Sequence, residues 1–161
     1  MGEHPVAQYI IDLLAQNGCW YETFQHEAVR TSLEAAEQRA DYTLHQGAKA
    51  IIARVKVPNE GKRFVMLVFP ADNKFDGAKV KRLLGAKDIR FATEAEVEEI
   101  TDGVKPGGVP PFGNRFGLGV IADPSLFGNE KIVFNAGRTT SIAMRSADYR
   151  RFVAPRIGEI V

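Results

Sequence analysis

The sequence has little cysteine, no long apolar run and almost no net charge, and each shortage excludes a class of protein. Cys19 is the only cysteine among 161 residues, so neither an internal disulfide nor a metal site built on paired cysteines can form. No apolar stretch approaches the length of a membrane span, and residues 1–5 lack the basic and apolar regions of a signal peptide. We therefore expect a cytoplasmic protein with no membrane partner.

The balance of charge gives no general attraction to nucleic acid. The formal net charge is +1, so any binding to RNA must come from a local basic patch. One stretch offers such a patch, although a solvated helix face explains the same charges. Its members are Lys74, Lys79, Lys81, Arg82, Lys87 and Arg90.

What is present is the composition of an ordinary folded domain. Apolar residues make up 45% of the chain and charged residues 25%, without a low-complexity tract, which excludes a disordered protein. A chain of this length is the size of one domain with a single core, and no shift in composition divides it. We expect residues 1–161 to form one domain.

Apolar spacing and turn residues predict an irregular mixture of helices and strands. Helices are expected over residues 5–17, 31–39, 76–84 and 93–101, with a last helix capped by Ser146 and running to residue 153. Strands are expected over residues 19–24, 48–57, 64–69, 89–92, 118–122, 131–135 and 140–145. The turn formers of residues 58–61 make the second and third of these strands a hairpin. Without a regular alternation of strand and helix, the expected fold class is α+β.

Several familiar catalytic and cofactor motifs are absent. The glycines of residues 113–119 lead into a strand rather than from a strand into a helix, so they are not a dinucleotide fingerprint. Residues 47–49 lack the rest of a P-loop, and no serine stands in a Gly-x-Ser-x-Gly elbow. His4, His26 and His45 do not have the spacing of a zinc site. We expect neither a metal nor a cofactor.

Two remaining features are able to carry chemistry. Lys49 opens a core strand, and its ammonium either reaches back to water or points into a cleft that strengthens its attraction to phosphate or an oxyanion. Residues 103–113 form a long loop rich in glycine and proline. Its amides either form a nest for an oxyanion or phosphate, or the loop merely connects two elements.

Four short segments, taken together and in order, carry a resemblance to a known family. They are His26-Glu27-Ala28-Val29-Arg30-Thr31, Gly47-Ala48-Lys49, Gly107-Gly108-Val109-Pro110-Pro111-Phe112-Gly113 and Phe134-Asn135-Ala136-Gly137. In these segments the sequence resembles the YbaK family, which includes the insertion domain of bacterial prolyl-tRNA synthetases. The resemblance covers nearly the whole chain. It implies an α+β fold with a mixed sheet, strongly curved or barrel-like, surrounded by helices.

The activity that the resemblance implies is aminoacyl-tRNA editing. A trans-acting deacylase would hydrolyse the ester of a mischarged small amino acid on tRNA, a task needed because binding pockets discriminate poorly between similar small side chains. A bound water, helped by the vicinal hydroxyl of the terminal adenosine, would be the nucleophile. The implied partners are the acceptor end of aminoacyl-tRNA and, as a further candidate, an aminoacyl-tRNA synthetase.

The resemblance also assigns roles to residues. Lys49, Gly107 and Gly108 would be catalytic, with Lys49 holding the terminal phosphate or the substrate carbonyl. The substrate-binding residues would be His26, Thr31, Val109, Pro110, Phe112, Gly113, Asn135 and Gly137.

Alternatives stay open for several of these assignments. Phe112 either stacks on the adenine or fills the core, Thr31 has a sufficient explanation as a helix cap, and His26 is as well explained by a structural role. The whole protein is alternatively a non-catalytic module that binds tRNA or a synthetase, or a hydrolase of another small ester or amide.

Overall fold

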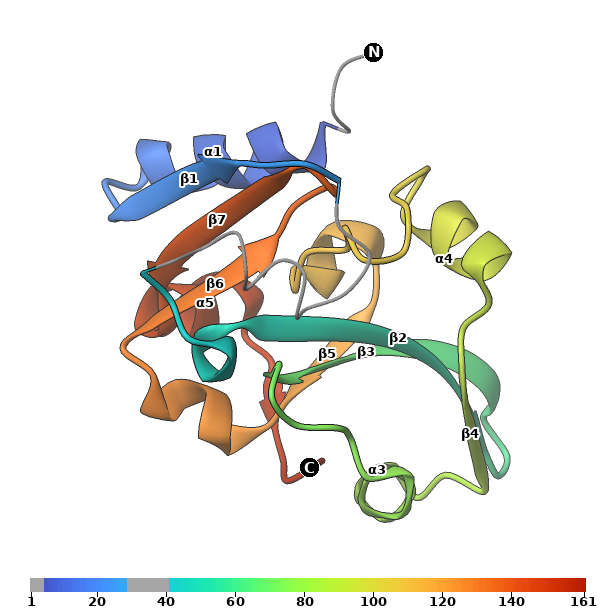
Figure 1. Ribbon diagram of the computed structural model, residues 1–161. Coiled ribbons are helices and arrows are strands. Elements are labelled where there is room, and N and C mark those ends of the chain that lie inside the picture. Colours follow the sequence, from blue (N-terminus) through green and yellow to red (C-terminus); the bar gives the residue numbers. More distant parts are fainter. Residues whose placement is uncertain (1–4, 29–40) are drawn as a thin grey trace.

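The computed structural model describes residues 5–28 and 41–161, which form helices packed around two β-sheets (Figure 1). One sheet is three-stranded in the order β1-β7-β6, and the other is five-stranded in the order β4-β2-β3-β5-β8. Pairing is antiparallel except where β5 runs parallel to β3 and to β8. The predicted α+β class is confirmed, and the sheets are two separate ones rather than a closed barrel.

The elements follow the predicted order with small shifts at their ends. The helices are α1 (Val6–Gln16), α3 (Gly77–Leu84), α4 (Glu94–Ile100) and α5 (Ser146–Val153), with 3-10 turns at Leu44–Gln46, Gly113–Phe116 and Pro124–Gly128. The strands are β1 (Tyr21–Gln25), β2 (Ala48–Val57), β3 (Gly61–Pro70), β4 (Asp88–Phe91), β5 (Gly119–Ala122), β6 (Lys131–Asn135), β7 (Thr140–Arg145) and β8 (Arg156–Ile157). The helix expected over residues 31–39 lies outside the described residues.

Side-chain capping marks where α3 and α4 begin. Thr93 and Glu96 form the predicted capping box at the start of α4, in which each side chain bonds the other's backbone amide. The prediction for Ser146 is wrong, because its hydroxyl makes no cap and instead donates to the carbonyl of Asn129 at 2.6 Å. That bond ties α5 to the turn before β6.

The strand β2 alternates its side chains between two apolar cores. Ala48 and Ile52 belong to the first core, which lies between the sheets and is completed by α1 and α5. Ala53 and Val55 belong to the second core, which Val80 of α3 covers from the other side. Figure 1 accordingly shows α1 beside the three-stranded sheet and α3 below the five-stranded sheet.

A single parallel bridge between Gly47 and Val133 joins the two sheets where the candidate residues lie. Paired residues in a ladder project their side chains to the same side, and residues two apart share a face. Lys49 and Asn135 each lie two residues beyond the bridge, so both project from the face opposite to the first core. Ser141, the register partner of Asn135, projects from it as well. We call this surface the site face.

Among the described residues, no helix is both long enough and apolar enough to cross a bilayer.

Candidate active site

A chain of side-chain hydrogen bonds crosses the site face and ends on the glycine-proline loop. Asn135 Nδ2 donates to the carbonyl of Gly107 at 2.8 Å, and Ser141 Oγ donates to Asn135 Oδ1 at 3.0 Å. His26 Nε2 lies 2.8 Å from Ser141 Oγ. The chain thus links the end of β1, the start of β7, the end of β6 and the loop, which are far apart in sequence.

The direction of each bond follows from what each atom is able to donate. Asn135 uses its amide hydrogen on Gly107, so its oxygen faces Ser141 and takes the single hydroxyl hydrogen. His26 Nε2 must then donate to Ser141 Oγ, while Nδ1 lies 2.8 Å from the carbonyl of Glu27, which is only an acceptor. The chain of donors therefore runs from His26 through Ser141 and Asn135 to the carbonyl of Gly107.

The loop enters the site through a turn that its sequence dictates. Residues 105–108 form a β-turn closed by a 3.0 Å hydrogen bond from the amide of Gly108 to the carbonyl of Lys105. Pro106 occupies the second position, and Gly107 occupies the third with a φ of +88°. Proline followed by a glycine at positive φ is the signature of a type II turn. The turn fixes the peptide planes around Gly107.

A close backbone contact seats this turn against the loop between β6 and β7. The amide of Gly137 donates to the carbonyl of Gly108 at 2.7 Å. A side chain at position 108 would place its Cβ 2.8 Å from the carbonyl carbon of Gly137, closer than real Cβ atoms approach. Position 108 therefore requires glycine because a side chain would collide with the backbone of Gly137. Position 137 favours glycine because its φ is +86°, a conformation that other residues rarely adopt.

The loop amides are not equally available to a substrate. The amide of Gly108 is committed to Lys105 in the turn, so the expectation that it lines a reacting ester is not met in this conformation. The amides of Gly107 and Val109 donate to no acceptor within residues 5–28 and 41–161. The amide of Gly107 is therefore an unpaired N–H set in a defined turn, as an oxyanion-binding group requires.

Lys49 supplies a second free donor on the same face. Its side chain is half-buried at the start of β2, and its ammonium makes no hydrogen bond or ion pair with any described residue. Its register partner in β3 is Phe69, a fully buried member of the second core. A cation held against an apolar floor without a counter-ion is suited to binding an anion.

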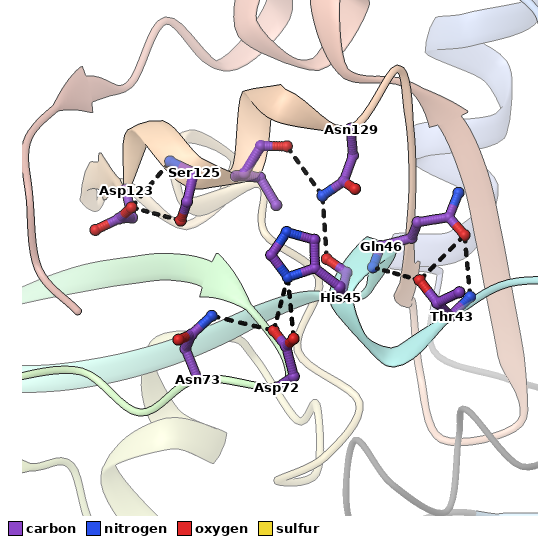
Figure 2. A network of polar contacts seen from close by, with 9 residues as sticks. Thr43, His45, Gln46, Asp72, Asn73, Asp123, Ser125 and Asn129 are labelled. Atoms are coloured by element: carbon purple, nitrogen blue, oxygen red, sulfur yellow. Dashed lines mark hydrogen bonds and ion pairs between the residues drawn. The ribbon is translucent and has the colours of Figure 1, made fainter.

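A second polar network fixes the segment that leads into β2 (Figure 2). Thr43 and Gln46 form a capping box around the short 3-10 turn, and the carbonyl of His45 accepts from Asn129 Nδ2 at 3.0 Å. Figure 2 also shows the imidazole of His45 facing Asp72, whose Oδ1 lies 2.9 Å from Nδ1. These contacts anchor the chain just before Gly47 and so position Lys49, which lies three residues after Gln46.

Most of the remaining predicted site residues face the core rather than a substrate. Phe112 is fully buried between Phe134 and Tyr149, with ring centroids 5.7 and 5.6 Å away, so it fills the core and does not stack on a base. Gly113 is buried where a Cβ would lie 2.6 Å from Val120, and Pro110 and Val109 face inward in the same stretch. These residues fix the glycine-proline loop to the first core. Thr31 lies outside the described residues.

The sequence analysis missed Ser141, the centre of the hydrogen-bonded chain. Its side chain is fully buried, and it precedes the apolar residues Ile142, Ala143 and Met144 of β7. A buried hydroxyl at the start of an apolar strand requires a hydrogen-bond partner. This requirement is the signal in the sequence by which Ser141 could have been found. As for metals, no three histidine, cysteine or carboxylate side chains gather into a binding site within the described part of the chain.

Comparisons with known proteins agree on one family. The family model described as "Aminoacyl-tRNA editing domain" matches residues 26–152. The chain is 36% identical over 152 residues to the multifunctional Ser/Thr-tRNA deacylase ProXp-y of Escherichia coli strain K12, covering 93% of this chain and 89% of that protein. It is also 27% identical over 165 residues to a proline–tRNA ligase of Trichlorobacter lovleyi, covering 92% of this chain but only 28% of the ligase.

A solved structure shows the same fold. A protein described as a candidate trans-editing enzyme for prolyl tRNA synthetase superposes with a TM-score of 0.78 at 23% identity, covering 99% of this chain and 98% of its own.

Proposed function

Because this chain belongs to the aminoacyl-tRNA editing domain family, we propose that it is a trans-acting deacylase that hydrolyses the ester of a mischarged small amino acid on tRNA. The similarity to a deacylase along 89% of that protein's length supports action in trans. The acceptor end of the charged tRNA is then the substrate. An aminoacyl-tRNA synthetase is a further candidate partner, which would release or present that tRNA.

One structural observation supports this proposal independently of family membership. The carbonyl of Gly107 is held by Asn135 Nδ2, while the amide of Gly107 and the ammonium of Lys49 have no partner among the described residues. Two free donors match the two negative groups of the substrate. These are the phosphate of the terminal adenosine and the oxyanion that develops during ester hydrolysis.

The reaction then has defined roles for the residues. Lys49 binds the terminal phosphate or the substrate carbonyl, and the amide of Gly107 donates to the carbonyl oxygen as it becomes negative. A water attacks the carbonyl carbon, the bond to the ribose oxygen breaks, and that oxygen takes up the proton. The vicinal ribose hydroxyl is placed to orient the water. The products are the free amino acid and uncharged tRNA.

His26, Ser141 and Asn135 act on this reaction by holding the turn of residues 105–108. Gly137 supports the same turn through its backbone bond to Gly108. Seryl- and threonyl-tRNA are the first substrates to test, because the deacylase relative is named for those amino acids.

The decisive experiment is deacylation of a panel of mischarged tRNAs by the purified protein. The panel includes seryl-, threonyl-, alanyl- and cysteinyl-tRNA species. We expect one or a few species to be hydrolysed, and Lys49→Ala to lower the rate by about 100-fold or more, as the loss of one transition-state donor does. Lys56→Ala is the matched control, because this exposed lysine lies on the same strand but projects from the opposite face.

Each outcome has a defined meaning. Equal activity of the Lys49→Ala variant, with its fold verified by circular dichroism, would refute the role of Lys49. A folded protein that binds uncharged tRNA but hydrolyses no charged species is instead a binding module, and cleavage of only small esters would indicate another hydrolase.

A further inference from the structure

Phe91 is an apolar side chain left in solvent on the edge strand next to β2. It is 60% exposed at the end of β4, and Tyr9, at 39%, is the other large hydrophobic residue so exposed among the described residues. The strand β4 pairs with β2 alone, and Phe91 lies opposite Ala53. Ala53 shares its face of β2 with Lys49, so Phe91 projects from the site face as well.

Phe91 is not isolated, because it ends a row of aromatic rings that begins next to Lys49. Phe69, the register partner of Lys49, has its ring centroid 6.3 Å from that of Phe75. The ring of Phe75 lies 5.2 Å from that of Phe91, edge to face. Burial falls along the row, since Phe69 is fully buried, Phe75 is half-buried and Phe91 is exposed. The row leads from the lysine to the surface along one face.

We propose that Phe91 and Phe75 form an aromatic shelf that stacks an unpaired base of the tRNA acceptor end, upstream of the terminal adenosine held at Lys49. This inference rests on the proposed function. Unpaired nucleotides are bound by stacking on aromatic rings beside a cation for the backbone, and any base is suitable because each has an aromatic face.

The charge near Phe75 and the distance from Lys49 both favour an unpaired base of the acceptor end on this shelf. Lys74 precedes Phe75, is exposed and makes no ion pair with a described residue, so it is available to a backbone phosphate. Four residues of β2 separate Lys49 from Ala53, a distance of about 13 Å in an extended strand. A short unpaired segment spans that distance, whereas a paired stem is too wide and stiff to place its bases on the ring.

The test compares two substrates that differ only in the upstream nucleotides. Hydrolysis of charged tRNA by the Phe91→Ser variant should show KM raised by roughly 5- to 100-fold, the effect of losing one stacked base. Hydrolysis of the same amino acid esterified to adenosine should be unchanged, because that substrate has no upstream base. Phe91→Trp should retain the wild-type KM for tRNA.

Tyr9→Ser is the matched control. It makes the same type of change at the other exposed aromatic residue, which lies on α1 under the guanidinium of Arg115 and away from the site face. We expect it to leave both substrates unaffected. The proposal would be overturned if Phe91→Ser had the wild-type KM for charged tRNA. It would also be overturned if the variant lost activity equally on charged tRNA and on the aminoacyl adenosine.

Failure of the proposed function gives a different result. If the wild-type protein hydrolyses neither substrate, binding of a short RNA ending in CCA is measured by fluorescence anisotropy for wild type and Phe91→Ser. Weaker binding by the variant then supports the shelf without hydrolysis, and equal binding rejects it.

Discussion

At the scale of one residue, the hydroxyl of Ser141 connects two side chains that hold the site together. It donates to Asn135 and accepts from His26, and it has no access to water that would replace either bond. Ser141→Ala leaves both partners unsatisfied, which costs about 1–3 kcal/mol of unfolding free energy. The same change releases the amide of Asn135 and therefore the Gly107 peptide.

We expect Ser141→Ala to reduce kcat for deacylation more than it raises KM, because the loss affects a group used in the transition state. Urea denaturation and steady-state kinetics check the two parts of this prediction. Ser125→Ala is the control, since this hydroxyl donates to Asp123 outside the site. A variant that is less stable but retains kcat would show that Ser141 is only structural.

At the scale of an element, the turn of residues 105–108 depends on the absence of a side chain at its last position. Gly108→Ala would drive a Cβ into the backbone of Gly137, so the turn must move away from the loop between β6 and β7. We expect activity to fall by about 100-fold, as it does when a catalytic group is displaced by about 1 Å. Gly128→Ala, where no heavy atom lies within 4 Å of an added Cβ, should be neutral in the same assay.

The end of the glycine-proline loop that lies near Pro111 is held by α5. Tyr149 of α5 is fully buried, and its hydroxyl donates to the carbonyl of Pro111 at 2.6 Å; burial raises the pKa of this phenol well above its usual value. Tyr149→Phe keeps the ring between Phe112 and Phe127 but leaves that carbonyl without a donor.

We expect Tyr149→Phe to lower the unfolding free energy by about 1–2 kcal/mol, measured by urea denaturation. An unchanged stability would mean that the hydroxyl bond contributes nothing net.

The elements themselves were largely predictable, because their signals are local. The helix expected over residues 76–84 is found as α3, with Asp76 and Gly85 as its caps, and the hairpin of β2 and β3 follows from its turn residues. Ser146 was mispredicted because α5 begins one residue earlier, with Arg145 at the N-cap position, and the hydroxyl of Ser146 instead turns to the carbonyl of Asn129. Which strands lie side by side was not predictable, since β1 pairs with β7 across most of the chain.

The site was predictable only as far as family motifs reach. Lys49, Asn135 and Gly107 stand out in the sequence, but the hydroxyl of Ser141, which connects Asn135 and Gly107 to His26, depends on that distant pairing. Phe112 belongs to the same motif yet lies in the core, because a motif records which residues occur and not which of them face the substrate.

At the scale of the whole molecule, Asp123 fastens the last residues of the sequence to the five-stranded sheet. Its carboxylate, almost fully buried, accepts from the amides of Ile160 and Val161 and from Ser125. Burial alone would raise the pKa of Asp123, but these hydrogen bonds outweigh it and the pKa is lowered. Stability from this group is present above the unfolded pKa of about 3.9 and is lost as pH falls through the folded value.

Asp123→Asn should therefore destabilise the protein by about 2 kcal/mol near neutral pH, where the charged acceptor is lost. The difference from wild type should shrink as the pH falls from about 5 to about 3. Urea denaturation across that range measures it, and a difference independent of pH would exclude the charge as the cause.

The hydrogen bond between His26 and Ser141 joins residues that are 115 positions apart, which has a consequence for biosynthesis. A nascent chain emerges from its amino-terminal end, so β1 is made long before β7, its one partner in the described sheet. Pairings this distant form late and slowly. The bonds that join His26 to Asn135 therefore form only after residue 141 has been made, and we expect an interrupted chain that ends before residue 140 to spare the charged tRNA used to make it.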